Sequence, residues 1–597
     1  MTCKKILYYL TAPIIFGVFS LLLGQDRSYD LAGYHYYNAF AFLNNKTSID
    51  FSVAGAQGFL NPILDIPYYY LNQITHPAFI GFIFGFLNGI LILLLYKIIE
   101  HVISINKNHF HKNLILFLSI VGCLTPNFLS SVGNSLGDNI TSLFILFSLY
   151  LLVINFRVFE RPKIEFKIFF TLFIIGFFVG FPVGLKLTNA PFSLAFLIAF
   201  FLAIKNSKKN KLFLLIFLGI SSFVGFLSSG GFWFLHLWNE FRNPFFPLLS
   251  NIFPSKISTL ITLSSELTPK NISQAIFYPF LRLFGFKQNF DSLGRQILWP
   301  TLYLLIFLFL FVRLKLHKIL YSKSNLSFSN FYSIEKFLIF YVFFGYILWM
   351  SVFGIQRYLI SIELFAPLAI YILIKNFNYN EYKKNVIFLI VCLFTVSYTL
   401  LGGFGSWGHT RWINPAIFVA KPIVENSSTA TVLMTDMSPI AWMLAEFPSD
   451  LAFVRLYAFE DIDPFLNDFI HKRYGKFYVI FSGHYNWRND NVKKWDNFLS
   501  VINVKKTKHS CENLDLFIKS VKFRGKVKYN SLNSNESCFL DIADKDRTNQ
   551  ADENNKLIEF NNQKLEKFNF TLNKSSCKAF PARLGMQNWS YIWCEIN

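Results

Sequence analysis

The sequence predicts a polytopic α-helical membrane protein that carries a soluble, mixed α/β domain at its C-terminal end. Of its 597 residues, 53% are hydrophobic and only 15% are charged, which is more apolar surface than a soluble domain can bury. Apolar runs long enough to cross a bilayer recur as far as Gly402. After Gly408 these runs shorten to strand length and the density of charge rises.

The distribution of basic residues indicates the orientation. The net charge of +21 is spread over short loops between apolar runs, which favours membrane topology over nucleic-acid binding. Lys4 and Lys5 precede the first apolar run, and this run lacks a small-x-small cleavage site, so we expect it to be retained. We therefore predict an integral protein of the inner or plasma membrane, with its N-terminus in the cytoplasm and its C-terminal domain outside it.

About eleven spans are predicted, because this number places basic residues at every cytoplasmic turn. Their approximate ranges are 6–23, 78–99, 114–129, 140–156, 168–185, 191–204, 212–230, 297–312, 337–353, 359–374 and 386–402. The membrane domain would then occupy residues 1–408, with long external loops at 24–76 and 232–296.

Residues 409–597 form the predicted soluble domain. The segments TATVLMT and KFYVIFSG have the length and composition of strands. The domain contains an even set of cysteines, namely Cys511, Cys538, Cys577 and Cys594. In an external compartment such a set favours disulfides, whose pairing the sequence leaves open, and the lack of a C-x-x-C spacing makes a zinc site the weaker interpretation.

The candidate chemistry lies in the expected external loops. The chain contains no G-x-S-x-G, Walker or H-E-x-x-H motif. The candidate catalytic residues are Asp26, Asp30 and His35, and the candidate substrate-binding residues are Asp138, Lys186, Asn189, Arg295, Arg357, Tyr358 and Glu363. Acids and cations at one membrane face suit an enzyme that acts on a membrane-borne phosphate donor. Carboxylates would activate a nucleophile, and Lys and Arg would hold the leaving phosphate.

Several of these segments resemble a known family. D-L-A-G-Y-H-Y-Y-N, at 30–38, and the following A-G-A-Q-G-F-L-N-P-I-L-D-I-P-Y-Y resemble the first external loop of bacterial GT-C-type glycosyltransferases that use polyprenyl-phosphate sugars. G-L-K-L-T-N (184–189), N-P-F-F-P (243–247) and Q-R-Y-L-I-S-I-E (356–363) resemble further segments of the same group. The resemblance covers about residues 1–410 and does not extend to the C-terminal domain.

The resemblance implies transfer of a sugar from a polyprenyl-phosphate-linked donor to an acceptor hydroxyl on the external face. An acidic residue of the first loop would act as base or orient the acceptor; by position this is Asp30, with Asp26 as the rival. Lys186 and Arg357 would hold the donor phosphate. The partners would be the lipid-linked donor, the bilayer and an envelope glycan, lipid or protein acceptor. The loop lacks the adjacent D-E or D-x-D pair of other branches, so no cofactor is assigned and a divalent metal is left open.

Two other functional classes stay open at this stage: a lipid or glycan transporter or flippase, and a non-catalytic envelope assembly protein. A transporter would need polar residues along a path through the membrane, whereas the predicted spans are nearly free of charge. Individual residues also have structural alternatives. His35 could be a packed histidine, Asp65 could begin a helix, and Lys186 could extend to the membrane interface.

Overall fold

The computed structural model describes the chain except for residues 1–2, 105–111, 163–164, 254–266, 282–295, 320–330, 378–379, 403–407, 458–463, 503–506 and 530–536. It divides into two compact units. The helical unit comprises Met1–Leu43 and Ala56–Ala416, and the sheet unit comprises Asn44–Gly55 and Ile417–Asn597. The helical unit therefore extends beyond the expected boundary at residue 408, and part of the expected first loop belongs to the sheet unit.

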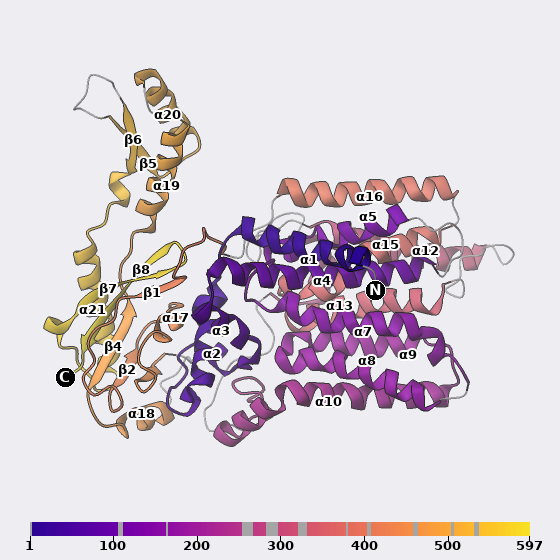
Figure 1. Cartoon of the computed structure of the whole chain (residues 1–597), viewed down its shortest axis with the longest axis horizontal. Coiled ribbons are helices and arrows are strands. Elements are labelled where there is room, and N and C mark those ends of the chain that lie inside the picture. The colour runs from indigo at the N-terminus through magenta and orange to yellow at the C-terminus, as the bar shows by residue number, and fades with distance from the viewer. Residues whose placement is uncertain are drawn as a thin grey trace. The chain divides into compact units, whose positions relative to one another are not determined.

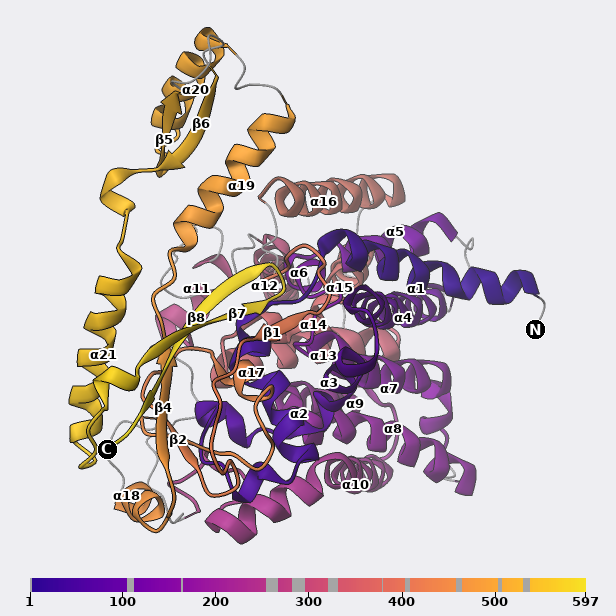
Figure 2. The ribbon, with the colours of Figure 1, turned by 60° about the vertical axis from the view of Figure 1, so that its left-hand side comes forward.

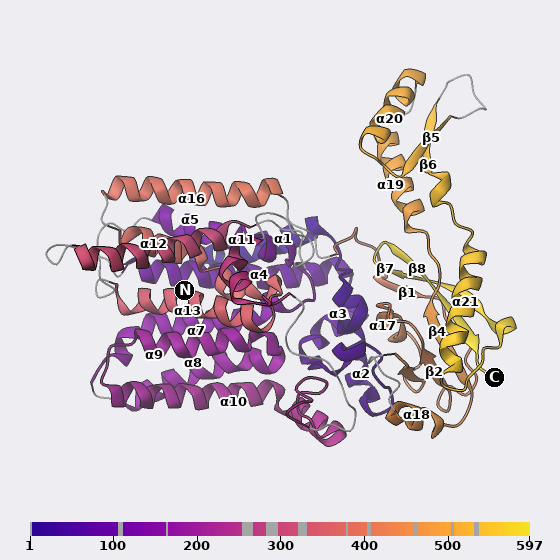
Figure 3. The same cartoon turned by 180° about the vertical axis from the view of Figure 1, so that it is seen from behind.

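The helical unit is a bundle of apolar helices (Figure 1). Its longer helices are α1 (Cys3–Leu23), α4 (Pro77–Ser104), α5 (Lys112–Cys123), α7 (Asp138–Phe159), α8 (Phe166–Leu185), α9 (Ala190–Ala203), α10 (Lys208–Phe241), α11 (Ile272–Leu281), α12 (Leu298–Ile319), α13 (Ser333–Val352), α15 (Ala366–Lys375) and α16 (Glu381–Gly402). The short helices α2 (Tyr36–Leu43), α3 (Ile66–Ile74), α6 (Pro126–Ser130) and α14 (Ile360–Glu363) lie between them. Helix α8 packs between α7 and α10, α1 packs on α4, and α9 packs on α13 (Figure 3).

Each predicted span contains helical residues, but the predicted number of spans is not confirmed. Among the described residues six helices are long and apolar enough to cross a membrane, or seven if the bent pair Gln356–Glu363 and Ala366–Lys375 counts as one span. The range 114–129 is not one helix, since α5 ends at Cys123 and α6 begins at Pro126. A proline disfavours helical geometry in the residue that precedes it, and Thr125 is extended. Helix α10 continues to Phe241, so the loop expected from residue 232 begins later.

Small residues allow α8 and α10 to approach closely. Gly176, Gly180 and Gly184 are spaced four residues apart, so they lie on one face of α8. A Cβ atom on Gly180 would overlap the backbone of Ser222, and one on Gly184 would overlap the side chain of Ser229. Contact of this kind is typical of helices that pack within a membrane. It fixes the end of α8, where Lys186 follows.

The sheet unit contains a six-stranded mixed sheet. Its strands are β1 (Ile417–Val419), β2 (Thr431–Met434), β3 (Ala452–Arg455), β4 (Phe477–Ser482), β7 (Lys578–Leu584) and β8 (Gln587–Glu595), in the order β1-β7-β8-β4-β2-β3. Strands β2, β3 and β4 are parallel, whereas β8 runs antiparallel to β4. Every residue of β2 and β3 is buried, as expected for parallel strands covered on both faces. Helices α17 (Ala441–Leu444), α18 (Pro464–His471) and α21 (Gln550–Glu566) accompany the sheet.

The segment Asn44–Gly55 joins the sheet unit through its backbone and one lysine. Phe51 forms a parallel bridge with Val454 of β3, and its N–H donates to the Phe453 carbonyl at 2.9 Å. The Lys46 ammonium donates to the Leu451 carbonyl at 2.5 Å and is completely buried. The expected loop 24–76 is thus shared between two units, which its sequence pattern did not indicate.

A small lobe extends from the sheet unit (Figure 2). It consists of α19 (Trp487–Val501), α20 (Lys508–Ser520) and the hairpin of β5 (Gly525–Tyr529) and β6 (Cys538–Ile542). Its core includes Val492, Leu514, Ile518 and Leu540. A disulfide joins Cys511 to Cys538 in this lobe, and a second joins Cys577 to Cys594 beside β7 and β8. The predicted disulfides are confirmed, and their pairing, which the sequence left open, follows from the fold.

The disulfide pairing predicts the result of differential alkylation. In denaturant without reductant, Cys123 and Cys392, which are free and buried in the folded chain, should be labelled completely. Cys511, Cys538, Cys577 and Cys594 should be labelled only after reduction, and non-reducing peptide mapping should recover the two pairs above. Free thiols at these four positions, or a bridge between Cys511 and Cys577, would contradict the assignment. Each bridge should contribute about 3–4 kcal/mol in the chain-entropy estimate.

The close contact of α8 with α10 can be tested with two glycines. Gly180→Val should separate the helices and lower the midpoint of thermal unfolding in detergent, since overpacking costs about 1–3 kcal/mol. Gly219→Val is the matched control, because no described atom of a neighbouring segment lies within 4 Å of the added Cβ. Equal midpoints for the two variants would show that α8 and α10 do not pack as described.

Candidate functional site

Lys186 and Asp138 meet because two neighbouring helices run in opposite directions. Asp138 is the first residue of α7, and Lys186 directly follows the last residue of α8. The Lys186 ammonium lies 2.5 Å from Asp138 Oδ1 and donates to the Leu136 carbonyl at 2.8 Å. Only 13% of the lysine side chain and 4% of the aspartate side chain are exposed. This lysine is a buried partner of a carboxylate, rather than a cation that extends into solvent.

Arg357 brings two carboxylates together. It lies in the 3-10 turn η8 (Gln356–Leu359), between α13 and α14. Its Nη1 lies 2.6 Å from Asp30 Oδ2, and its Nε lies 3.8 Å from Asp138 Oδ2. We call Asp30, Asp138, Lys186 and Arg357 the charge cluster. Its two acids and two cations balance, which is the condition under which ionised groups tolerate burial.

Asp30 is held by the first turn of the chain after α1. It directly precedes η1 (Leu31–His35), a single π-helical turn that continues into α2; such turns are frequent at functional sites. The Tyr34 hydroxyl donates to Asp30 Oδ2 at 2.9 Å. Burial alone would raise the pKa of the Asp30 carboxyl, but the neighbouring positive charges, with Arg357 first among them, hold this pKa below its usual value. Asp30 is therefore ionised at neutral pH.

His35 and Asp65 form a second buried pair. His35 Nδ1 lies 2.6 Å from Asp65 Oδ1, and both side chains are almost completely buried. Burial raises the pKa of Asp65, although the histidine opposes the shift. Helix α3 begins at Ile66, directly after Asp65, as the sequence suggested, but the Asp65 side chain makes no cap hydrogen bond. Its carboxylate contacts His35 instead.

Tyr358 lies against both cations of the charge cluster. The centre of its ring is 5.2 Å from Lys186 Nζ and 5.4 Å from the Arg357 guanidinium carbon. An aromatic face at this distance attracts cations. Tyr358 therefore helps to position both basic groups.

The other candidate residues lie in different surroundings. Asp26 accepts hydrogen bonds from the Ser28 N–H and from the N–H and hydroxyl of Ser135, an arrangement that ties two loops together. Asn189 donates to the Lys186 carbonyl at the turn after α8. Glu363 accepts from Asn127 Nδ2 at 2.7 Å. Arg295 lies outside the described residues.

Two neighbours of the charge cluster were not among the candidate residues. Tyr34 stands four residues after Asp30, a spacing that places side chains on one face of a helical turn, so the sequence contained a signal for it. Asp65 stands thirty positions from His35 along the chain, and no local pattern indicates their pairing.

The residues of the charge cluster do not fit a divalent metal site. The part of the chain that the structure describes contains no group of three or more His, Cys, Asp or Glu side chains that could hold a metal ion. Asp30 and Asp138, the oxygen donors of the cluster, already face Arg357 and Lys186. A divalent cation at these carboxylates would have to lie beside two positive charges, which is electrostatically unfavourable.

Among known proteins, the chain is similar to solved structures but matches no family model and no curated protein. The structure is similar to the archaeal oligosaccharyltransferase AglB from Archaeoglobus fulgidus in complex with an inhibitory peptide and a dolichol-phosphate, with a TM-score of 0.42 and 12% identity over 92% of this chain and 75% of that one. It is also similar to the A. fulgidus oligosaccharyltransferase in complex with Zn and sulfate, with a TM-score of 0.42 and 12% identity over 82% of this chain and 69% of that one. For the apo form of the same protein the TM-score is 0.42 and the identity is 13%, over 83% of this chain and 71% of that one.

The pairing of Lys186 with Asp138 predicts strong coupling between their substitutions. Lys186→Met and Asp138→Asn should each destabilise the protein by about 3–5 kcal/mol, because each leaves an uncompensated buried charge. The double variant should lose much less than the sum. Lys97 and Glu100, whose side chains are 25% and 28% exposed, are the control pair, and their coupling should not exceed about 1 kcal/mol. Thermal unfolding followed by tryptophan fluorescence measures the coupling in both pairs. Additive losses of stability for the Lys186 and Asp138 variants would contradict the pairing.

Proposed function

We propose that this protein is a membrane glycosyltransferase that moves a sugar from a polyprenyl-phosphate-linked donor to an acceptor hydroxyl. The observation that carries the proposal is the charge cluster, in which two cations and two carboxylates from four separate segments meet at the ends of apolar helices. A lipid-linked phosphate is an anion held at the membrane boundary. Buried Lys and Arg side chains are suited to bind it.

Both basic residues carry several hydrogen-bond donors, three in Lys and five in Arg. Lys186 and Arg357 are therefore suited to contact carboxylate and phosphate oxygens at one site. In the proposed reaction the acceptor oxygen forms a bond to the anomeric carbon while the bond from this carbon to the phosphate oxygen breaks. The polyprenyl phosphate leaves with the bonding electron pair, and Lys186 and Arg357 stabilise its negative charge.

Asp30 is the proposed acceptor of the proton. Its carboxylate is ionised and faces Arg357 and Tyr34, so it can orient the acceptor hydroxyl and take its proton as the new bond forms. Asp26 is a poorer choice, because three hydrogen-bond donors already hold it. Inversion at the anomeric carbon is expected from the resemblance to GT-C-type enzymes.

The disulfides support an external location for the sheet unit. Disulfides persist in oxidising compartments and are rare in the cytosol, and this unit contains two. This agrees with the topology expected from the basic residues, in which the C-terminal domain lies outside the cytoplasm. The acceptor would then be an envelope glycan, lipid or protein.

Turnover by the purified protein tests the proposal. With a polyprenyl-phosphate sugar as donor, Asp30→Asn should lower kcat by about 10²–10⁴-fold and change donor KM much less, because it removes the base and keeps the shape. Arg357→Lys should also lower the rate, since it keeps the charge and loses the planar fork. Glu100→Gln in α4 is the control acid and should keep normal activity. Normal turnover by both Asp30→Asn and Arg357→Ala would refute the assignment, and transport of intact donor without release of polyprenyl phosphate would indicate a flippase.

Removal of divalent cations gives an independent prediction. Since the donor set of the charge cluster does not fit such a cation, transfer should proceed at an unchanged rate in excess EDTA. Radiolabelled sugar transferred per minute, with and without added Mg²⁺ or Mn²⁺, is the measurement. A rate that falls to background in EDTA and returns with one of these ions would show that Lys186 and Arg357 do not replace a metal.

A further inference from the structure

A cavity of the sheet unit lies where several strands meet at one edge of the sheet. It has a volume of about 370 Å³. Parallel strands place their carboxyl ends at the same edge, so residues after β2 and at the end of β4 lie together there. The antiparallel strand β8 and helix α21 complete the wall. Its principal lining residues are Asp436, Ser482, Trp487, Phe560, Asn561 and Trp589.

Four buried polar atoms of this lining have no hydrogen-bond partner among the described residues. They are Asp436 Oδ1, Ser482 Oγ, Asn561 Oδ1 and Trp589 Nε1. Asn561 is only 2% exposed, and its amide nitrogen is already used by the Leu557 carbonyl. Buried polar groups are almost always satisfied. These atoms belong to residues that line one cavity, and a set of acceptors, a hydroxyl and an N–H there favours a ligand rich in hydroxyl groups, each of which donates and accepts.

Two aromatic side chains border the same cavity and are about half exposed. Trp487 is 44% exposed and Phe560 is 54% exposed. The Trp487 ring lies edge-on to Trp589, with 5.1 Å between the ring centroids, and its Nε1 donates to the Asn588 carbonyl at 2.8 Å. These contacts fix the ring while its surface stays accessible. A rigid, exposed aromatic face beside unsatisfied polar atoms can pack on the apolar face of a sugar ring and leave its hydroxyls to the polar atoms.

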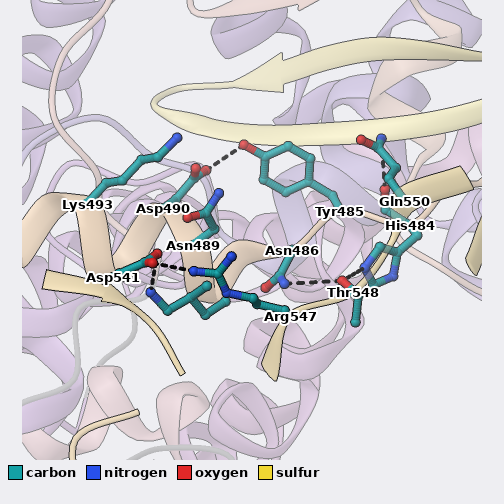
Figure 4. A pocket seen from close by; sticks show the side chains of 11 residues that line it. His484, Tyr485, Asn486, Asn489, Asp490, Lys493, Asp541, Arg547, Thr548 and Gln550 are labelled. Carbon is teal, nitrogen blue, oxygen red and sulfur yellow. Dashed lines mark hydrogen bonds and ion pairs between the residues drawn. The ribbon is translucent and has the colours of Figure 1, made fainter. Parts of the chain in front are cut away.

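An adjoining cavity of about 440 Å³ differs in character (Figure 4). It shares His484 and Tyr485 with the first cavity. Its polar groups are largely paired with one another: the Tyr485 hydroxyl donates to Asp490 at 2.7 Å, and His484 Nε2 lies 2.7 Å from the Thr548 hydroxyl. It also contains Lys493 and Arg547, whereas no Lys or Arg that the structure describes lines the first cavity.

We propose that the cavity around Asp436 and Trp487 binds a small neutral saccharide. The described lining includes no Lys or Arg, and the carboxylate of Asp436 disfavours an anionic ligand, which separates this site from the proposed phosphate site at the charge cluster. Lys564, whose ammonium lies 4.6 Å from the centre of the Phe560 ring, donates to the Thr435 carbonyl. Trp487 and Phe560 supply the packing surface, and the four unsatisfied polar atoms bind hydroxyl groups. This inference concerns binding by the sheet unit and does not depend on the proposed transfer reaction.

Saturation-transfer NMR on the full-length protein tests this site. The protein is held in a polyoxyethylene detergent, because maltoside detergents carry sugar headgroups. The probes are the methyl glycosides of glucose, galactose and N-acetylglucosamine, maltose and cellobiose, with the open-chain polyol sorbitol as the negative control. At least one pyranoside should receive saturation from the protein, and sorbitol should not. Trp487→Ala and Phe560→Ala should each weaken this binding by about tenfold.

Two control variants show whether the saccharide binds in this cavity or elsewhere on the protein. Trp495→Ala, on the same helix as Trp487 and 52% exposed, should bind like the wild type. Lys97→Ala lies in α4 of the helical unit and outside the charge cluster, and it should also leave saccharide binding unchanged. If no pyranoside receives saturation, or if binding survives both Trp487→Ala and Phe560→Ala, the proposed site is wrong. Loss of binding in Trp495→Ala would overturn it as well.

Discussion

The helical unit depends on compensation of buried charge. Arg357 lies between Asp30 and Asp138, and Lys186 shares Asp138 with it. Removing any one member leaves a charge without its partner in a poorly solvated site, which is far less favourable than the intact balanced set. The four side chains come from segments that only the fold brings together, so the site exists only in the folded helical unit.

Backbone geometry places each candidate site. The glycines of α8 allow close packing on α10, and this contact fixes the end of α8, where Lys186 pairs with Asp138 at the start of the antiparallel neighbour α7. In the sheet unit, parallel strands deliver Asp436 and Ser482 to one edge. The residues of the charge cluster, and Asp436 and Ser482 of the cavity, therefore lie at or beside the ends of elements, whose packing positions their side chains.

The sequence predicted the class of fold and named all four residues of the charge cluster as candidates. Apolar runs located helical segments in every predicted span, and Asp30, Asp138, Lys186 and Arg357 were recognised as polar residues at the ends of such runs. The sequence did not predict which side chains pair with one another. The contact of His35 with Asp65, for example, depends on how two loops fold. The number of spans was not confirmed, since among the described residues six helices, or seven with the bent pair, are long and apolar enough to cross a membrane. Helices α5 and α9, with 12 and 14 residues, are shorter than a full span. The composition of Asn44–Gly55 did not indicate that this segment belongs to the sheet unit.

Binding of a lipid phosphate is the most direct test of the central claim. Native mass spectrometry of the purified protein compares retention of a polyprenyl phosphate with retention of the same polyprenol without its phosphate. The phosphate form should be retained selectively, Lys186→Ala and Arg357→Ala should lose this selectivity, and Lys97→Ala should keep it. Equal retention of the two lipids by the wild type, or unchanged selectivity in both cluster variants, would contradict the assignment of these residues to the donor phosphate.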